Sequence, residues 1–295
     1  MTFGVSTHLF HNEVLDAAHL ATIRRHGFDA VEVFATPTHV DYRSRERAAE
    51  IAGWLKAEGL RAHSIHAPIT SALRDGAWGD VWSNASVDAT LRQAAIAETE
   101  RAMDFAATIG ARFVVIHLGI PDGMKVPAAD NDAGVLARSL AAMATAARSF
   151  DLTLALEVIP NHLSTPEALV ERLDAAADDE TDELAGHGIC LDVGHAHMMA
   201  ARGARGAVDA VEVVGGHLVT THIHDNNGRS DDHLVPFQGT IDWSALVMAF
   251  QKVGYDGTWM FEIAAPAAGT DADATLARAA KARQRLEALG APIEF

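Results

Sequence analysis

The chain has 295 residues, a formal net charge of −17, 49% hydrophobic residues and 21% charged residues. This length allows one large α/β barrel or two ordinary domains. The negative charge argues against a large nucleic-acid footprint, which needs many basic side chains on phosphates. No apolar run approaches the ~18 residues of a membrane span, and the first residues do not resemble a signal peptide. The one cysteine, Cys190, cannot form an internal disulfide, so we expect a reducing, cytoplasmic location.

Apolar, β-branched runs alternate along the chain with helical stretches rich in Ala, Leu, Glu and Arg. The runs cover residues 3–9, 30–35, 61–66, 112–118, 153–158, 188–193, 219–224 and 258–263. The helical stretches cover residues 12–26, 44–58, 87–109, 132–149, 166–177, 206–214, 244–253 and 271–289.

Strands that alternate with helices imply parallel strands joined by right-handed crossovers. Eight such units in just under 300 residues predict an α/β fold, a single (β/α)8 TIM barrel domain over residues 1–295. The alternative is an open doubly wound sheet, but no glycine-rich phosphate loop follows the first run.

Four of the apolar runs end on a carboxylate or an imidazole, at Glu157, Asp192, His222 and Glu262. In a barrel the active site lies at the carboxyl ends of the strands, so these side chains should meet at its mouth. Each residue alone has an ordinary structural explanation. The four together predict a divalent metal site in which carboxylates are also available for proton transfer.

A second group of polar residues lies near the same strand ends. Each member can ligate a metal, contact substrate or orient another ligand, and the group consists of His66, His117, His195, Asp231 and His233. His224 shares a strand face with His222, so both can point inward. His8 ends the first run, where we expect it to pack rather than to line a pocket. The long loop 69–86 holds Trp78 and Trp82, which either cover the substrate or pack on the barrel rim.

These residues together resemble the xylose isomerase-like TIM barrel superfamily, which includes sugar phosphate isomerases and epimerases and AP endonuclease family 2. The resemblance rests on Glu157, Asp192 with His195, the segments 222–229 (HIHDNNGR) and 233–243 (HLVPFQGTIDW), and Glu262. One departure is Pro-Phe-Gln-Gly at 236–239, where sugar-branch members commonly have Pro-Gly-Glu-Gly.

In the sugar branch the resemblance implies one ion of Mn²⁺, Co²⁺ or Mg²⁺, with His195 and Arg229 contacting substrate oxygens. The ligands would be Glu157, Asp192, His222 and Glu262. Substrate contacts are also predicted for His66, His117 and His224. In the endonuclease branch it implies three Zn²⁺ ions, whose ligands would be His66, His117, Glu157, Asp192, His195, His222, Asp231, His233 and Glu262.

We therefore predict a metal-dependent isomerase or epimerase of carbohydrate metabolism that acts on a ketose or a related keto-sugar or polyol. Glu157 and Glu262 are the predicted catalytic residues, moving a proton through a metal-stabilised enediolate. Two alternatives stay open: a lyase or dehydratase on a keto-sugar or related acid, and a zinc-dependent phosphodiesterase. The expected partner is a small carbohydrate; nucleic acid and membrane are not expected, and a homo-oligomer stays open.

Overall fold

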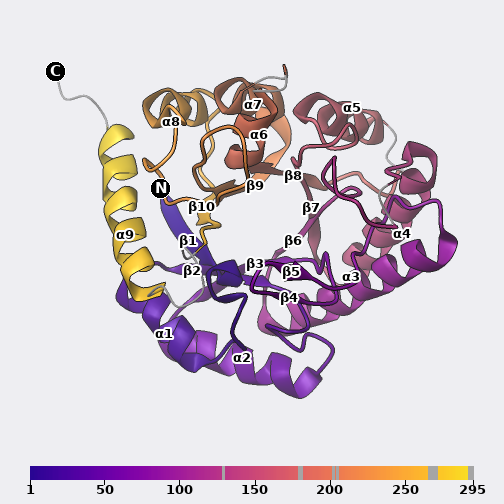
Figure 1. Cartoon of the computed structure of the whole chain (residues 1–295), viewed down its shortest axis with the longest axis horizontal. Helices are drawn as coiled ribbons and strands as arrows, with labels where there is room; N and C mark the ends of the chain where they lie inside the picture. Colours follow the sequence, from indigo (N-terminus) through magenta and orange to yellow (C-terminus); the bar gives the residue numbers. More distant parts are fainter. Residues whose placement is uncertain (128–129, 179–181, 201–202, 204–205, 265–271, 292–295) are drawn as a thin grey trace.

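The computed structural model describes residues 1–127, 130–178, 182–200, 203, 206–264 and 272–291. Eight parallel strands close a barrel in the order β1-β10-β9-β8-β7-β6-β3-β2, and the helices form a ring around it (Figure 1). The predicted TIM barrel is thus confirmed. Its strands are β1 (Thr2–Ser6), β2 (Ala30–Phe34), β3 (Arg61–His66), β6 (Phe113–Ile116), β7 (Thr153–Glu157), β8 (Gly188–Asp192), β9 (Leu218–Ile223) and β10 (Thr258–Phe261).

Most of the surrounding helices begin at a side chain that accepts a backbone N–H. Asp88, Asp132, Thr165 and Asp242 act in this way at the starts of α3, α4, α5 and α8. The helices are α1 (Ala17–Arg25), α2 (Arg45–Glu58), α3 (Ala89–Ile109), α4 (Ala133–Ser149), α5 (Pro166–Ala177), α6 (Val193–Ala200), α7 (Ala207–Val214), α8 (Trp243–Lys252) and α9 (Ala272–Leu289).

The structure differs from the predicted elements near the barrel mouth. The first helix begins at Ala17 rather than at residue 12, because the 3-10 turn Thr7–Phe10 comes first and Asp16 caps the helix. Helix α6 follows β8 directly, where no helix is predicted. Its first turn is held by Asp192, whose Oδ1 accepts the backbone N–H of His195 at 2.6 Å.

The long loop after β3 contains an antiparallel hairpin of β4 (Leu73–Arg74) and β5 (Ala77–Trp78). Its turn residues, Asp75 and Gly76, have φ angles of 50° and 76°, the left-handed region that Gly adopts without steric cost. The hairpin is anchored to neighbouring loops: Asn12 Oδ1 accepts the N–H of Asp75 at 2.7 Å, and the Arg74 guanidinium donates to the carbonyl of Thr38 at 3.1 Å.

The apolar core lies mainly between the strands and the helices, as expected for parallel strands covered on their outer side. The barrel interior is partly polar. Arg61 donates to His63 Nδ1 at 2.8 Å, and His63 Nε2 donates to Thr220 Oγ1 at 2.9 Å. Because these groups satisfy one another, the interior can carry polar side chains beneath the mouth. Within the described ranges, no helix has the length and apolar character needed to span a bilayer.

Candidate metal centre

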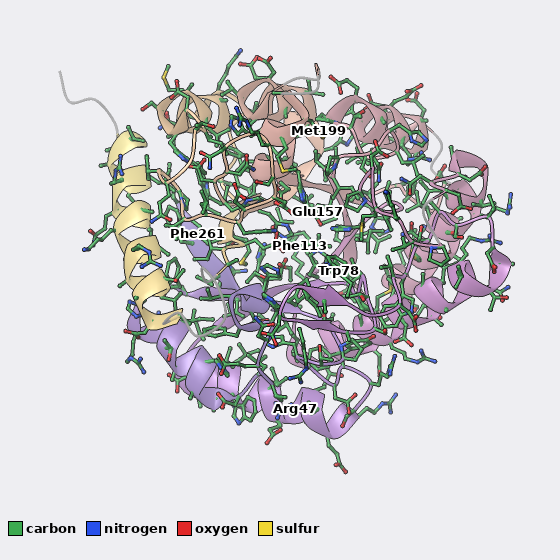
Figure 2. All side chains as sticks on the ribbon, viewed as in Figure 1. Arg47, Trp78, Phe113, Glu157, Met199 and Phe261 are labelled. Atoms are coloured by element: carbon green, nitrogen blue, oxygen red, sulfur yellow. The ribbon has the colours of Figure 1, made fainter. Side chains whose placement is uncertain are left out.

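Strands β7, β8, β9 and β10 bring four buried side chains together at the carboxyl end of the barrel. Glu157, Asp192, His222 and Glu262 each offer a ligand atom, and these atoms lie within 4.8 Å of one another. His222 Nδ1 is 3.2 Å from Glu157 Oε1, 3.3 Å from Glu262 Oε2 and 3.8 Å from Asp192 Oδ2. Glu157, Asp192 and His222 are fully buried and Glu262 is 3% exposed. Figure 2 shows Glu157 near the barrel axis.

This donor set fits a divalent cation. Three carboxylates in one buried cluster repel one another unless positive charge lies among them. Glu157 Oε2 is buried and makes no hydrogen bond within the described part of the chain, although two imidazoles lie nearby. One imidazole and three carboxylates are ligands that suit Mn²⁺, Co²⁺ and Zn²⁺. The four residues predicted as metal ligands therefore lie together in a site that could hold the ion.

Glu32 on β2 completes this site and was not singled out from the sequence. It is fully buried, and its Oε2 accepts hydrogen bonds from Ser64 Oγ at 2.8 Å and from His222 Nε2 at 3.1 Å. A carboxylate on the far nitrogen of an imidazole fixes the ring and its tautomer. His222 therefore turns Nδ1 toward the other ligands. The signal in the sequence is a charged residue within the apolar run 30–35.

A second group of ligand atoms shares Glu157. His117 Nε2 lies 3.0 Å and His66 Nε2 lies 3.2 Å from Glu157 Oε2, and the three residues form a further cluster able to hold an ion. Glu157 thus uses one oxygen toward His222 and the other toward this pair. A carboxylate placed in this way can bridge two cations or join one cation to substrate-binding imidazoles.

Asp231 gathers two more of the predicted residues. Its Oδ2 is 3.1 Å from His195 Nε2 and 3.2 Å from His233 Nε2. His195 Nδ1 lies 3.3 Å from Asp192 Oδ2, so this group adjoins the four-ligand cluster. His224 Nε2 contacts both Asp192 oxygens, at 3.0 and 3.1 Å, and its ring stacks on that of His233 with centroids 4.2 Å apart.

The acidic and basic side chains of the site shift one another's pKa values toward the charged forms. Burial would raise the pKa of Glu157, but His117 and His222 outweigh it and hold that pKa well below its usual range. Burial would lower the pKa of His66, but Glu157 raises it to about 9. In the same way Asp231 outweighs burial and raises the pKa of His233 to about 10. Metal binding at these imidazoles must therefore displace protons.

A cavity of about 130 Å³ lies above the cluster. Its ionisable side is made of His8, His66, His117, Glu157, His195, Asp231, His233 and Glu262. His8 thus lines the cavity and also packs against other rings. The centroid of its ring lies 4.9 Å from that of His11 and 4.8 Å from that of His233. Trp78 of the β4–β5 hairpin also lines the cavity, while Trp82 is not among its lining residues.

Two predicted substrate contacts are not among the lining residues of this cavity, although the ring of one of them, His224, stacks on that of the lining residue His233. The other, Arg229, is exposed, whereas His224 is buried. The roles assigned to them, and to the other site residues, stay predictions.

The closed (β/α)8 barrel places the chain among the TIM-barrel proteins. The carboxylates and imidazoles gathered at its strand ends form a candidate metal centre. The family model described as xylose isomerase-like TIM barrel matches residues 20–289, and the chain belongs to this family. An uncharacterised protein of Methanocaldococcus jannaschii is 27% identical over 271 residues, which cover 89% of this chain and 83% of that protein. An uncharacterised protein of Sinorhizobium fredii is 28% identical over 221 residues, which cover 69% of this chain and 67% of that protein.

Solved structures share the same fold. A D-tagatose 3-epimerase-like protein has 22% identity and a TM-score of 0.73, covering 98% of this chain and 97% of that one. A D-psicose 3-epimerase with D-tagatose, from Clostridium cellulolyticum H10, has 16% identity and a TM-score of 0.74, covering 99% and 100%. The protein IolI, with a bound zinc atom, has 17% identity and a TM-score of 0.72, covering 97% and 98%. At these identities the similarity establishes the fold.

Proposed function

We propose that the protein is a divalent-metal-dependent isomerase or epimerase of a ketose or related keto-sugar. The observation that carries this proposal is the placement of two glutamates on separate strands around one imidazole. Glu157 Oε1 and Glu262 Oε2 lie 3.2 and 3.3 Å from His222 Nδ1, and both residues line the same cavity. Two carboxylates at one small cavity are the groups needed to remove and return a proton.

The ion, of which Mn²⁺ is our first choice, would be held by Glu157, Asp192, His222 and Glu262. It would polarise the substrate carbonyl and the neighbouring hydroxyl, which acidifies the proton on the carbon between them. Glu157 or Glu262 removes that proton. Return of the proton to the neighbouring carbon, which was the carbonyl carbon, would give isomerisation, and return to the original carbon from its opposite face by the other glutamate would give epimerisation. His66, His117 and His195 line the cavity and can hydrogen-bond the substrate oxygens.

A second candidate function is zinc-dependent phosphodiester cleavage. It is favoured by the His66–His117–Glu157 cluster and by the contacts of Asp231 with His195 and His233, which give room for further ions. The net charge of −17 and the cavity of about 130 Å³ favour a small substrate instead. A lyase or dehydratase would share the proton-removal step and differ by expelling a leaving group.

Solvent-hydrogen exchange tests the proposal. The protein loaded with Mn²⁺, Co²⁺ or Mg²⁺ is incubated in D₂O with a panel of ketoses, keto-sugars and an abasic DNA duplex. We expect deuterium next to the carbonyl of one ketose, together with its isomer or epimer. Loss of water from a keto-sugar would point to the lyase, and strand cleavage with three zinc ions per chain would point to the phosphodiesterase. Either result would overturn the proposal.

A further inference from the structure

His8 differs from the other ionisable residues that line the cavity above the metal centre. Each of the others has a side chain that makes at least one hydrogen bond or ion pair, and they are His66, His117, Glu157, His195, Asp231, His233 and Glu262. The His8 imidazole makes neither within the described ranges, and its Nδ1 is buried without a partner there. Buried polar groups in proteins almost always have a hydrogen-bond partner. The described residues around His8 therefore leave its hydrogen-bonding capacity unused.

The ring of His8 is nevertheless held in one orientation. Its centroid lies 4.9 Å from that of His11, with the ring planes inclined by 22°, and 4.8 Å from that of His233, with the planes inclined by 37°. The ring of Phe34 meets it edge to face at 4.9 Å. The carbonyl of His8 also accepts a hydrogen bond from His11 Nδ1 at 2.8 Å. Because rings pack on several sides of it, the imidazole presents the same edge to each ligand that enters.

His8 lies next to the candidate metal ligands without being one of them. It follows β1 in the 3-10 turn Thr7–Phe10, and β1 lies between β10 and β2 in the barrel (Figure 1). The ring of His233 connects the two groups, since its Nδ1 is 3.8 Å from Glu262 Oε2 and the same ring packs on His8. A substrate whose carbonyl end reaches the ion would therefore bring a carbon farther along its chain to His8.

A hydroxyl is the substrate group that suits this imidazole. It both donates and accepts hydrogen bonds, so it can pair with either tautomer of the ring. The pair would replace no hydrogen bond that the described residues make to the His8 side chain. An analogue without that hydroxyl would leave the imidazole unpaired inside the cavity, and a site built to bond a hydroxyl rejects such an analogue. Resting on the function proposed above, we infer that His8 determines specificity by hydrogen-bonding a hydroxyl at the non-reacting end of a polyhydroxylated ketose.

Binding to the metal-loaded protein tests this contact without requiring turnover. Dissociation constants are measured calorimetrically for fructose, tagatose, psicose and sorbose, each with its 4-deoxy, 5-deoxy and 6-deoxy analogues. In the best-bound series, we expect the wild type to bind at least one analogue about 10-fold more weakly than the parent ketose. Wild-type protein that binds every analogue as tightly as its parent ketose would overturn the inference.

Two variants assign the lost affinity to His8. His8→Phe keeps a packed ring but has no ring nitrogen, so it should bind the parent ketose about 10-fold more weakly and lose the penalty for one analogue alone. His8→Gln, whose amide extends about as far as the imidazole Nε2, should keep that penalty. Metal content and thermal unfolding of both variants check that they fold. Wild-type penalties in His8→Phe, an equal fall at all positions, or loss of the penalty in both variants would contradict the inference.

The results also separate this inference from the proposed function. If His8→Phe loses the penalty at one position but no ketose exchanges its proton in D₂O, the proposed function fails and the contact of His8 stands. If exchange occurs and His8→Phe keeps the wild-type penalties, the inference alone fails. If none of the four ketoses binds, the inference fails whatever the exchange experiment shows.

Discussion

Glu32 Oε2 lies 3.1 Å from His222 Nε2, and both side chains are fully buried. The contact joins β2 to β9 across the barrel interior, and it leaves Nδ1 of the same ring facing Glu157 and Glu262. The ring is therefore oriented before any cation enters the site. Preorganisation of this kind makes a ligand more basic and lowers the conformational cost of binding metal.

The first prediction concerns this orienting carboxylate. Glu32→Gln keeps the shape of the side chain but removes its charge, so we expect the affinity for Mn²⁺ or Co²⁺ to fall about 10- to 100-fold. Calorimetric titration of the metal-free protein measures the change. Glu100→Gln, at an exposed position on α3, is the matched control and should bind as the wild type does. Equal affinities for the Glu32 variant and the control would remove Glu32 from the account.

The two glutamates of the proposed reaction give the second prediction. Glu157→Gln and Glu262→Gln should each lower kcat by about 10²-fold or more, because an amide cannot accept the proton. Metal content must be measured for each variant under the same conditions, and turnover is compared at full metal occupancy. Normal turnover by either variant would show that its carboxylate does not move the proton.

The third prediction concerns the loop that carries Asp231 and His233. Buried Asp225 accepts hydrogen bonds from the backbone of Phe237 at 3.0 Å and from the indole N–H of Trp243 at 2.8 Å. Asp225→Asn replaces a charged acceptor and should reduce the free energy of unfolding by about 2 kcal/mol. Urea titration measures this, with the exposed Asp256→Asn as control. A stability equal to that of the control would show that the carboxylate does not hold the loop.

The fourth prediction is a dependence of stability on pH that arises away from the metal centre. Burial lowers the pKa of His39 to about 4, and its ring is held by the Glu13 carbonyl and Thr7 Oγ1. The depressed pKa means that the unfolded chain takes up a proton first as pH falls. The free energy of unfolding therefore keeps its full His39 contribution above about pH 6.5 and loses it as pH falls toward about 4. The loss amounts to about 2 kcal/mol by about pH 5.

Urea unfolding at about pH 7.5 and about pH 5 tests this linkage. His39→Gln should lose less stability between the two conditions than the wild type does, because it has no imidazole to protonate. His162→Gln, at an exposed position, should behave as the wild type. The same pH dependence in wild type and His39→Gln would show that His39 does not produce the effect.

The barrel, and the meeting of the four candidate ligands at its mouth, could be predicted because their pattern is local. Glu157 and Asp192 each close an apolar run, and the eight-fold repeat places such ends at one mouth. Glu32 could not be found in this way. It lies in the middle of the run 30–35, where a charged residue is also typical of an exposed strand face, and only closure of the barrel turns it toward His222.

Two elements near the barrel mouth, helix α6 and the β4–β5 hairpin, could not be predicted from the sequence, for different reasons. Helix α6 has no separate capping residue in the sequence, because Asp192 ends β8 and also accepts the N–H of His195. The β4–β5 hairpin has strands of two residues each, too short for any periodicity. That hairpin carries Trp78 into the lining of the cavity, so this part of the lining becomes visible only in the folded chain.

The most direct test of the metal centre is the number of divalent ions retained per chain, measured by elemental analysis after loading and exhaustive dialysis. The wild type should retain at least one Mn²⁺, Co²⁺ or Zn²⁺ ion. Asp192→Ala, which removes one of the four clustered ligands, should lose one ion per chain relative to the wild type while staying folded. A folded wild type that retains no ion, or a variant that retains as many as the wild type, would contradict the account.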